Sequence, residues 1–421
     1  MKHYLRNMSF TSAGPDTSQW RDVYVSAAAR GVSYCGDMLS ATALVLAFQS
    51  RGAGGWAVAA LLIAATVPPI VLSPLTGRLA DRVDSRILLT AVGLAQAACC
   101  GLMAYTRSTA ALIALSVLLA AGLAVTQPTF GALLPAMVDR PNLPRAVAIG
   151  QTATSIGMLV GPAVAGVLVG AYGLRVPLLL DGATYLAVVV AGLTLRTRRN
   201  ARPAAGAAPE AAGAPEPGWL LRRDRLLTAI VVMISTAVAA VTLVNVVEVF
   251  FVRGDLHASP TVYGLLSSVW LAAMLVGAWL VARRHPDDSS LGMAMVGMLA
   301  VTCAVIAAAS AVPAVGWLIG LWIVGGLMNG GENTVAGVLL GRRVPPSARG
   351  RAQARVGAAV NVANMIGYAL GGALLGIAAP RLLLAAAGLT GLAVVAAFAV
   401  PVWRAGRADM PAPDPVLEPV A

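Results

Sequence analysis

Charged residues are scarce in this chain of 421 residues: Asp, Glu, Lys and Arg together make up 11% of it. In a typical soluble domain they account for about a quarter. Hydrophobic residues make up 58%, and the mean hydropathy is +0.79. So few polar side chains cannot cover the surface of a soluble globule of this size. The composition therefore excludes an ordinary soluble protein and predicts a polytopic membrane protein.

Cysteine is also scarce, and its placement gives no sign of a disulfide framework. The four cysteines lie inside apolar runs and form no Cys-x-x-Cys pair; they are Cys35, Cys99, Cys100 and Cys303. A zinc site uses closely spaced cysteine pairs, and a disulfide framework is typical of small extracellular domains rather than of apolar membrane segments. We therefore predict no disulfides, no metal site and no cofactor.

Several sequence motifs are missing. The chain has no His-Glu-x-x-His, Gly-x-Ser-x-Gly or phosphate-binding glycine loop, so the sequence predicts no enzymatic activity. The segment before Trp20 is polar and contains Gly14-Pro15, unlike the apolar core of a cleavable signal peptide. We expect membrane insertion to rely on the first membrane helix.

A net charge of +12 would suit a nucleic-acid partner, but no basic face with aromatic or groove-reading elements accompanies it. The arginines lie in short loops between apolar segments. We therefore predict the lipid bilayer, and not nucleic acid, as the surroundings of this chain.

Long apolar segments dominate the sequence. A helix needs about 20 mostly apolar residues to cross a bilayer. Twelve segments meet this requirement, at residues 22–49, 56–77, 86–106, 109–137, 146–171, 175–195, 226–252, 261–282, 290–311, 314–340, 352–378 and 381–403. The predicted fold class is therefore an all-α membrane protein, and the even number of helices places both termini on one side.

Basic residues are distributed unevenly between alternate loops. Of the 30 Lys and Arg residues, 24 lie in the tails, the central segment and every second loop, five lie in the opposite loops, and Arg30 lies within the first apolar segment. Cytoplasmic loops carry the excess of Lys and Arg in membrane proteins. We therefore expect a multi-pass protein of the cell (inner or plasma) membrane with both termini in the cytoplasm.

An Ala-, Pro- and Gly-rich segment at residues 196–225 divides the chain, and its composition predicts a cytoplasmic linker. The flanking halves resemble each other: a shift of 206 residues places Arg145, Gly161 and Gly166 on Arg351, Gly367 and Gly372. We therefore predict a six-helix bundle at 1–195, the linker, a second six-helix bundle at 226–403 and a cytoplasmic tail at 404–421.

The loop after the second apolar segment reads Gly77-Arg78-Leu79-Ala80-Asp81-Arg82-Val83-Asp84-Ser85-Arg86. It resembles the Gly-x-Leu-Ala-Asp-Arg-x-Gly-Arg-Arg signature of the major facilitator superfamily. Six positions match, while Asp84 replaces the second glycine and Ser85 replaces the next arginine. The Asp84 variant is similar to the macrolide-efflux and enterobactin-exporter branch, which usually has arginine at the position of Ser85.

The resemblance covers the membrane region and implies two pseudo-symmetric six-helix bundles with a substrate site between them, near the bilayer midplane. It also implies a cytoplasmic latch formed by Gly77, Asp81, Arg82 and Arg86, with Asp139 completing the network. Asp81 would pair with Arg82 or Arg86, or with the positive N-terminal end of the helix expected at 352–378. The alternative interpretation is a solvated topology signal.

A glycine-rich stretch in the fifth segment contains Gly157, Gly161, Pro162 and Gly166. It is similar to the Gly-Pro-x-x-Gly-Gly signature of antiporters in the superfamily, which favours export by analogy. Counterparts in the second half are Gly367 and Gly371. The alternative role is close helix packing, because small residues four apart let helix backbones approach each other in lipid.

Five ionisable residues lie within the apolar segments: Arg30, Asp37, Asp181, Glu248 and Glu332. Each costs about 2.5 to 3.5 kcal/mol at the centre of a membrane helix, so each is expected to face a cavity or a partner. In the superfamily, helices 1, 4, 7 and 10 line the central cavity, and all except Asp181 fall on these helices. We expect Asp181, near the outer start of its helix, to be structural.

These residues suggest specific roles in the cavity. Asp37 would bind a proton or a cationic substrate, and Arg30, on the same helix face about two turns nearer the cytoplasm, would modulate its charge. The alternative is that both residues neutralise partners on neighbouring helices. Further cavity residues are expected beside the two glutamates and on the fourth segment: Asn329 and Asn333 near Glu332, Asn245 near Glu248, and Gln127. The fourth segment lacks the arginine of many proton-coupled relatives, which leaves the coupling ion open.

We therefore predict a secondary active transporter that exports an amphiphilic small molecule, such as an antibiotic, drug or siderophore, in exchange for protons. It would work as a monomer by alternating access. Histidine lies only in tails and loops, so carboxyl groups would carry the protons. The alternatives are an importer or lipid flippase of the same fold and, from another class, a membrane sensor or enzyme.

Overall fold

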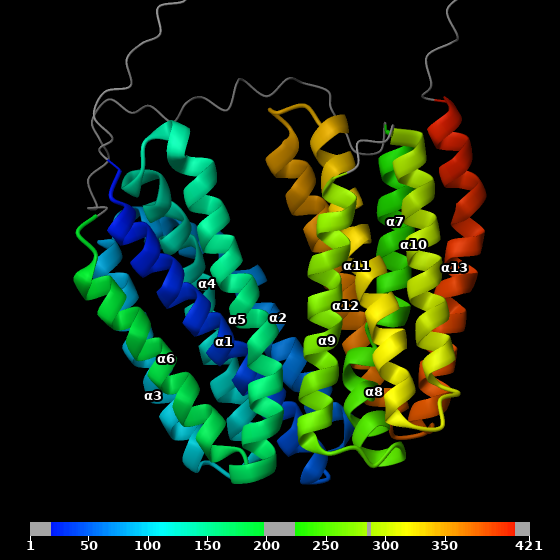
Figure 1. Cartoon of the computed structure of the whole chain (residues 1–421), viewed down its shortest axis with the longest axis horizontal. Helices are drawn as coiled ribbons and strands as arrows, with labels where there is room; N and C mark the ends of the chain where they lie inside the picture. The colour runs from blue at the N-terminus through cyan, green and yellow to red at the C-terminus, as the bar shows by residue number, and fades with distance from the viewer. Residues whose placement is uncertain (1–17, 198–223, 284–287, 409–421) are drawn as a thin grey trace, which may run out of the picture.

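The computed structural model describes residues 18–197, 224–283 and 288–408. Most of the predicted linker (198–223), the end of the predicted tail (409–421), the surroundings of Gly77 and the side chain of Asp81 lie outside the described part. Within it, the helices form two groups that lie side by side, one from each half of the chain (Figure 1).

Six long helices form the first group. They are α1 (Trp20–Ser50), α2 (Gly54–Arg82), α3 (Ser85–Tyr105), α4 (Thr109–Met137), α5 (Leu143–Tyr172) and α6 (Arg175–Thr194). A short 3₁₀ turn, Arg140–Asn142, precedes α5.

The second group contains a broken first helix followed by five long ones. The broken helix consists of α7 (Arg225–Val241), α8 (Val244–Phe250) and a π-helical segment (Phe251–Asp255); then come α9 (Pro260–Ala282), α10 (Asp288–Ala309), α11 (Val315–Arg343), α12 (Arg349–Leu374) and α13 (Pro380–Ala408). The sequence pattern predicted one continuous helix at 226–252. The break at Thr242 and Leu243 is a feature that the apolar pattern alone does not encode.

Eleven helices of the described part are long and apolar enough to cross a membrane when the broken helix counts as one. The twelfth, α11, has 29 residues and spans about 43 Å at about 1.5 Å per residue, more than the bilayer core of about 30 Å. Its mean hydropathy falls short because Asn329, Glu332 and Asn333 lie in its middle. The polar patch marks α11 as a helix that faces something other than lipid.

Side-chain caps explain where several helices begin. Ser108 accepts a hydrogen bond from the backbone N–H of Ala111 (3.4 Å) at the start of α4. At the start of α7, Asp224 accepts one from Leu227 (2.9 Å). Such caps satisfy N–H groups that have no partner within the first helical turn.

The charged loop after α2 is shorter than the sequence pattern suggests. Helix α2 continues through Arg82, and only Val83 and Asp84 separate it from α3. Asp84 begins α3 by accepting a hydrogen bond from the backbone N–H of Arg86 (2.7 Å). The arginines therefore extend a helix beyond its apolar part, which their long side chains allow.

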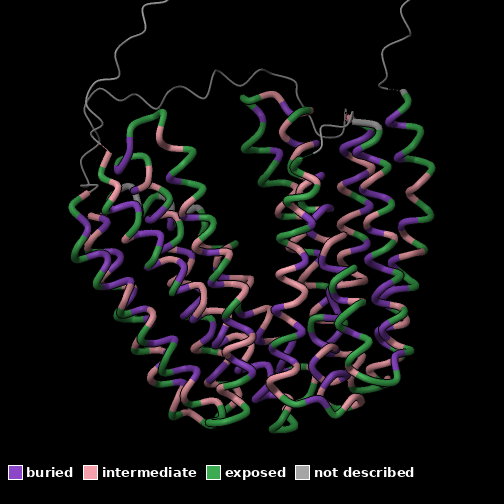
Figure 2. The backbone as a smooth tube through the Cα atoms, in the orientation of Figure 1, coloured by how far each residue is buried: buried purple, intermediate pink, exposed green. Residues whose placement is uncertain are grey.

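Exposed segments run along the outward faces of both groups (Figure 2), and many of the exposed side chains are large and apolar, such as Val71, Leu102 and Leu186. A belt of exposed apolar residues is expected where helices face lipid.

Equivalent pairs of helices pack in the two groups through glycine. On α5, a side chain at Gly157 would meet the carbonyl oxygen of Gly31 on α1, and one at Gly161 would lie 2.6 Å from Cβ of Met38. In the second group, α12 packs in the same way against the broken helix: a Cβ at Gly367 would lie 3.0 Å from the carbonyl oxygen of Ala239. The pseudo-symmetry of the sequence is therefore a symmetry of packing.

The two groups contact each other at the end opposite the linker, called here the far end, and separate toward the linker end (Figure 1). At the far end, a Cβ at Gly166 of α5 would lie 3.0 Å from Cα of Thr261 on α9, and one at Gly372 of α12 would lie 2.8 Å from Cβ of Ala59 on α2. Helices α5 with α9 and α2 with α12 thus form the contact between the halves.

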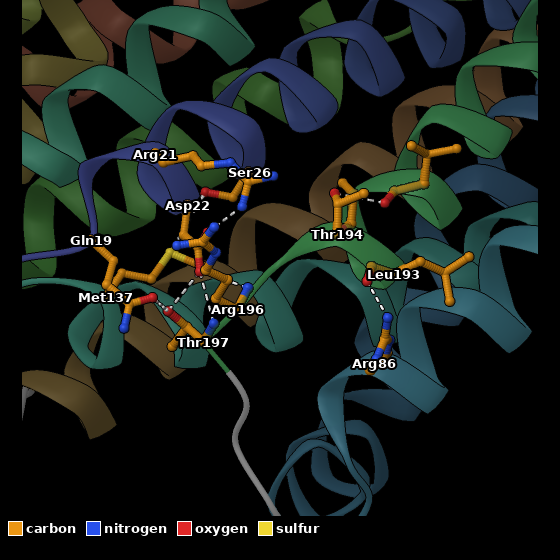
Figure 3. A network of polar contacts seen from close by, with 12 residues as sticks. Gln19, Arg21, Asp22, Ser26, Arg86, Met137, Leu193, Thr194, Arg196 and Thr197 are labelled. Atoms are coloured by element: carbon orange, nitrogen blue, oxygen red, sulfur yellow. Dashed lines mark hydrogen bonds and ion pairs between the residues drawn. The ribbon is translucent and has the colours of Figure 1, made fainter.

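At the linker end, Asp22 ties the end of α6 to the start of α1 (Figure 3). Its Oδ2 atom accepts hydrogen bonds from the backbone N–H groups of Arg196 (2.9 Å) and Thr197 (2.7 Å) and from the Thr197 hydroxyl (2.9 Å). The Asp22 side chain is 1% exposed. This buried carboxyl group fixes the position at which the chain leaves the first bundle.

Candidate functional site

A cavity of about 610 Å³ lies between the two groups of helices. The first group contributes mainly apolar residues of α1, with Leu62 of α2 and Pro162 of α5. The second group contributes the polar and aromatic residues, from α8, α9, α10, α11 and α12. Its volume lies within the range of about 300 to 1,000 Å³ that is usual for small-molecule sites.

Glu248 of α8 lines this cavity together with two tryptophans. Its Oε1 atom accepts a hydrogen bond from the indole N–H of Trp322 on α11 (3.0 Å). Trp322 in turn meets Trp270 of α9 edge to face, with ring centroids 5.9 Å apart and an interplanar angle of 75°. The carboxyl group is therefore held against an aromatic wall.

Glu332 of α11 is the second carboxyl group of the cavity. Its Oε1 atom accepts a hydrogen bond from the Thr302 hydroxyl on α10 (2.6 Å), and its Oε2 atom accepts one from the Asn329 amide (3.5 Å). Asn333, which follows Glu332 and lies one turn after Asn329, is exposed and also lines the cavity. The polar patch in α11 therefore faces the space between the halves.

The break between α7 and α8 also borders the cavity. The Thr242 hydroxyl at the break donates a hydrogen bond to Oδ1 of Asn364 on α12 (2.9 Å). Asn245, just beyond the break, interacts with Tyr368 on α12 through its side chain. Irregular backbone at membrane depth is tolerated where it lines a cavity, and discontinuous helices build the sites of many transporters.

Asn364, Tyr368 and the tryptophans were not among the predicted site residues. Ionisable residues stand out within apolar segments, whereas these side chains carry no charge and do not. The available signal was the pair Asn364 and Tyr368, four residues apart and thus on one helix face of the segment at 352–378.

The ionisable side chains that line the cavity are all acidic. Two carboxyl groups, four Asn side chains and the aromatic residues Tyr263, Trp270, Trp322 and Tyr368 line it, while none of its lining residues in the described part is Arg, Lys or His. The net charge of +12 is therefore located elsewhere on the molecule.

The predicted cavity residues of the first bundle lie elsewhere. Arg30 and Gln127 line a separate cavity of about 20 Å³ together with Tyr34, Gln96 and Thr126. The guanidinium group of Arg30 lies over the ring of Phe130 on α4, 6.0 Å from its centroid.

Asp37 does not appear among the lining residues of either cavity. Its Oδ1 atom accepts a hydrogen bond from the Tyr185 hydroxyl on α6 (2.5 Å). Asp181, which was expected to be structural, is 0% exposed and lies two turns inside α6. It interacts electrostatically with Asp37.

The residues of the predicted latch adopt separate positions at the linker end. Arg86 donates a hydrogen bond to the carbonyl oxygen of Leu193 near the end of α6 (Figure 3). Arg82 is exposed, and Asp139 accepts a hydrogen bond from the Ser18 hydroxyl (3.5 Å). The surroundings of Gly77 and the side chain of Asp81 are outside the described part.

The described residues contain no group of three or more His, Cys, Asp or Glu side chains that could hold a metal ion. The acids of the central cavity are each bound to hydroxyl, amide or indole groups instead. What the arrangement can do is bind a molecule of mixed polar and apolar character between two helical bundles.

Solved structures of transporters share this fold. The nucleoside transporter NupG is 15% identical, with a TM-score of 0.72, and the match covers 90% of this chain and 98% of that one. A bacterial homologue of the iron transporter ferroportin, in an inward-facing state, is 15% identical with a TM-score of 0.70 over 92% and 99% of the two chains. A bacterial homologue of the human lysosomal transporter Spinster, inward-facing and unoccupied, is 15% identical with a TM-score of 0.65 over 92% and 94%.

A search of the curated proteins finds no match. The family model named Major Facilitator Superfamily matches residues 27–312 and again residues 229–418, which together span nearly the whole membrane region. With two six-helix groups and a cavity between them, the chain belongs to the major facilitator superfamily.

Proposed function

We propose that this protein is a secondary active transporter that exports positively charged amphiphilic small molecules in exchange for protons. The observation that carries this proposal is the central cavity, which combines two carboxyl groups with an aromatic wall and has no basic side chain among its described lining residues. A buried negative charge without a basic partner favours a cationic ligand.

The aromatic residues give the cavity a second means of binding a cation. The faces of tryptophan and tyrosine rings attract ammonium groups within about 6 Å of the ring centroid. Trp270 and Trp322 present such rings beside Glu248. Leu62, Val45 and Leu271 supply apolar surface for the remainder of the molecule. An amphiphilic cation would thus find charge, ring faces and apolar contacts in one place.

Exchange with protons follows from the same acids. A carboxylate that binds a cationic substrate releases it more easily once the carboxyl group binds a proton, because protonation removes the negative charge. Proton and substrate would then compete for Glu248 and Glu332, which lie on different helices of the second bundle. Such competition couples the inward movement of protons to the outward movement of substrate.

Two further observations support export. The stretch around Pro162 resembles the antiporter signature of the superfamily, and in the structure this stretch of α5 contacts α9 at Gly264. The contact lies at the far end, where the two halves must separate to open the cavity on that side. The Gly166 and Gly264 backbones meet there without side chains between them.

The test is a proton-flux assay with the full chain in liposomes. Purified protein is reconstituted with an imposed proton gradient, and a pH-sensitive dye inside the vesicles reports proton movement as lipophilic cations, macrolides and siderophores are added. A lipophilic cation should evoke proton release, whereas an anionic compound of similar size and hydrophobicity should not. Empty liposomes control for leakage caused by the compound itself.

Flux measurements with a radiolabelled responding compound decide the direction. Movement of proton and compound in opposite directions supports the proposal. Movement in the same direction would identify a proton-driven importer, and transport of an anionic compound in preference to the cation would contradict the role of the acidic cavity.

A further inference from the structure

A second pair of acids lies inside the first bundle and is not part of the central cavity. Asp37 of α1 and Asp181 of α6 interact electrostatically. Gly36 brings the two helices together at this point, because a Cβ on Gly36 would meet Oδ1 of Asp181 and the hydroxyl of Thr184. Only a glycine lets the backbone of α1 approach α6 so closely here.

The groups around this pair are mainly hydrogen-bond donors. Tyr185 donates to Oδ1 of Asp37 (2.5 Å). Thr184 donates to Oδ1 of Asp181 (3.2 Å), and the Cys100 thiol of α3 donates to its Oδ2 atom (3.5 Å). Ser40 of α1 also lies beside Asp181. The site is thus enclosed by three helices of one bundle.

Within the described part of the chain, no basic residue neutralises the two acids. The other ionisable groups near the pair are neutral in their ordinary form: Tyr34, Cys35, Cys99, Cys100 and Tyr185. Arg30, the nearest cation on α1, interacts with Tyr34 and lies over Phe130. Two negative charges at a buried site of low polarity repel each other strongly, which favours binding of a proton or another cation there.

One oxygen atom marks where that cation binds. Oδ2 of Asp37 is buried and has no hydrogen-bond partner in the described part of the chain. A buried polar atom without a partner costs about 1 to 3 kcal/mol, and a proton bound between the two carboxyl groups removes this cost. The thiol and hydroxyl donors around the pair suit a protonated acid better than a metal ion, which prefers a shell of oxygen ligands.

We propose that Asp37 and Asp181 share one proton at a site inside the first bundle, and that this proton moves during transport in addition to the proton that competes with substrate at Glu248 and Glu332. In the loaded site, one carboxyl group carries the proton on an oxygen atom and donates it in a hydrogen bond to the other carboxylate. Release returns the proton to water and leaves both groups ionised. The assignment of the proton as a transported ion rests on the proposed proton exchange, whereas proton binding itself does not.

A small polar cavity lies next to the site, on its linker-end side. The cavity, of about 20 Å³, is lined by Tyr34 of α1 and Val188 of α6. Tyr34 lies one turn from Asp37, and Val188 lies one turn from Tyr185, both toward the linker end. Its other lining residues include Gln96, Thr126 and Gln127. A cavity of this size and polarity accommodates about one water molecule. Tyr34 interacts with both Arg30 and Asp37 and thus links the cavity to the acid pair.

The site can influence the contact between the halves through α1 and α5. The residue after Asp37, Met38, lines the central cavity and packs against Gly161 of α5. Farther along α5, Gly166 contacts α9 at the far end. Loading or emptying the proton site changes how α1 packs on α6, and the α1–α5 contact transmits this change to the far-end contact and to the cavity wall.

The first test measures proton binding without any substrate. Infrared difference spectra of the purified full chain, recorded as the pH is changed, show the C=O band of each carboxyl group that gains or loses a proton. We expect one band that shifts in Asp37→Asn and in Asp181→Asn and is absent in the double variant. Glu248→Gln, which alters an acid of the central cavity, should leave that band in place.

Two outcomes of this test would overturn the proposal. One is that the double variant shows the same pH-dependent C=O bands as the unchanged protein. The other is loss of the band on addition of NaCl at constant pH, which would identify sodium as the bound cation. Tyr185→Phe, which keeps the aromatic ring, provides a second probe: the band should shift because Asp37 loses its donor, and an unshifted band contradicts the assignment.

The second test concerns transport. For a compound that exchanges across the liposome membrane, Asp181→Asn should reduce gradient-driven transport roughly tenfold, within the range of about 5- to 150-fold that is usual for coupling between two sites. Equilibrium exchange without a gradient should stay near normal. The control variant is Asp255→Asn. Asp255 is paired with Arg381 (3.8 Å) outside both sites, so this variant should keep both gradient-driven transport and equilibrium exchange.

These results separate the two proposals. If no compound exchanges in the unchanged protein but the infrared band behaves as expected, the proposed function fails and the proton site stands. If gradient-driven transport survives in Asp181→Asn, the pair does not carry a proton that is moved during transport.

Discussion

Trp322 donates its indole hydrogen to Oε1 of Glu248 over 3.0 Å, although the two residues lie 74 positions apart, on α11 and α8. The same indole ring meets Trp270 edge to face. The Trp322 side chain therefore provides a hydrogen-bond donor to the Glu248 carboxyl group and also forms part of the aromatic wall. The contact thus joins α8, α9 and α11 of the second bundle at the wall of the central cavity.

The link predicts a measurable coupling between the two residues. Trp322→Phe keeps an aromatic ring but leaves Glu248 without its donor, so the free energy of unfolding should fall by about 1 to 3 kcal/mol. Glu248→Gln retains an acceptor for the indole and should cost less. In a double-mutant cycle followed by thermal unfolding in detergent, the two changes should be non-additive; additive losses would show that the hydrogen bond contributes nothing.

Glu332 should determine affinity for the charge of the substrate. Glu332→Gln keeps the size of the side chain and its hydrogen bond with Thr302 but removes the negative charge. The dissociation constant of a lipophilic cation should rise roughly tenfold, which corresponds to about 1.4 kcal/mol. A neutral compound of the same shape should bind as before, measured by scintillation proximity. An equal loss for both compounds would indicate a change of shape and not of charge.

Much of the fold could be predicted because crossing a bilayer imposes a simple rule of length and polarity. Apolar runs such as 109–137 coincide with a helix, α4, in the structure. The ends of other helices differ, since Arg82 and Arg343 extend α2 and α11 into polar surroundings where hydropathy no longer reports helix formation. The break at Thr242, whose hydroxyl donates to Asn364 on α12, is not encoded in local hydropathy.

The candidate site was predictable only where polarity was unusual. Glu332 and Glu248 stand out in apolar runs, and the structure places both at the cavity. The direction in which a side chain points depends on the rotation of its helix, which the sequence does not fix. Asp37 therefore faces Tyr185 inside its own bundle, and Asp181 proves to be its neighbour although it was expected to be only structural.

Gly264 should control closure of the far end. A Cβ at this position would meet the carbonyl oxygen of Pro162 and lie 3.0 Å from Cα of Gly166, so Gly264→Ala should cost about 1 to 3 kcal/mol in the conformation seen here. With spin labels attached at positions 172 and 257, in place of Tyr172 and His257, the fraction of molecules with a long distance between the two labels across the far end should then increase. Gly131→Ala is the matched control, because that position has open space around it. Equal distance distributions in the two variants would contradict the prediction.

Asp22 should be important for stability rather than for substrate selection. Asp22→Asn replaces one carboxylate oxygen by an amide nitrogen and weakens acceptance from Arg196 and Thr197, so the free energy of unfolding should fall by about 1 to 3 kcal/mol. Thermal unfolding measures this loss. Asp255→Asn is the control: because Asp255 is partly exposed, its substitution should lower the free energy of unfolding only slightly. Unchanged dissociation constants in the folded fraction are expected, since Asp22 does not line the central cavity.

Asp84 shows why the sequence departs from the superfamily signature at this position. Its carboxyl group caps α3 through the N–H of Arg86, and both aspartate and glycine are favourable residues at such a position. Asp84→Ala should therefore lower the free energy of unfolding by about 1 kcal/mol, whereas Asp84→Gly, which restores the signature, should lower it by only a few tenths. Thermal unfolding of the two variants side by side distinguishes capping from a role in the latch: if Asp84→Gly is the more damaging change, the carboxyl group does more than begin a helix.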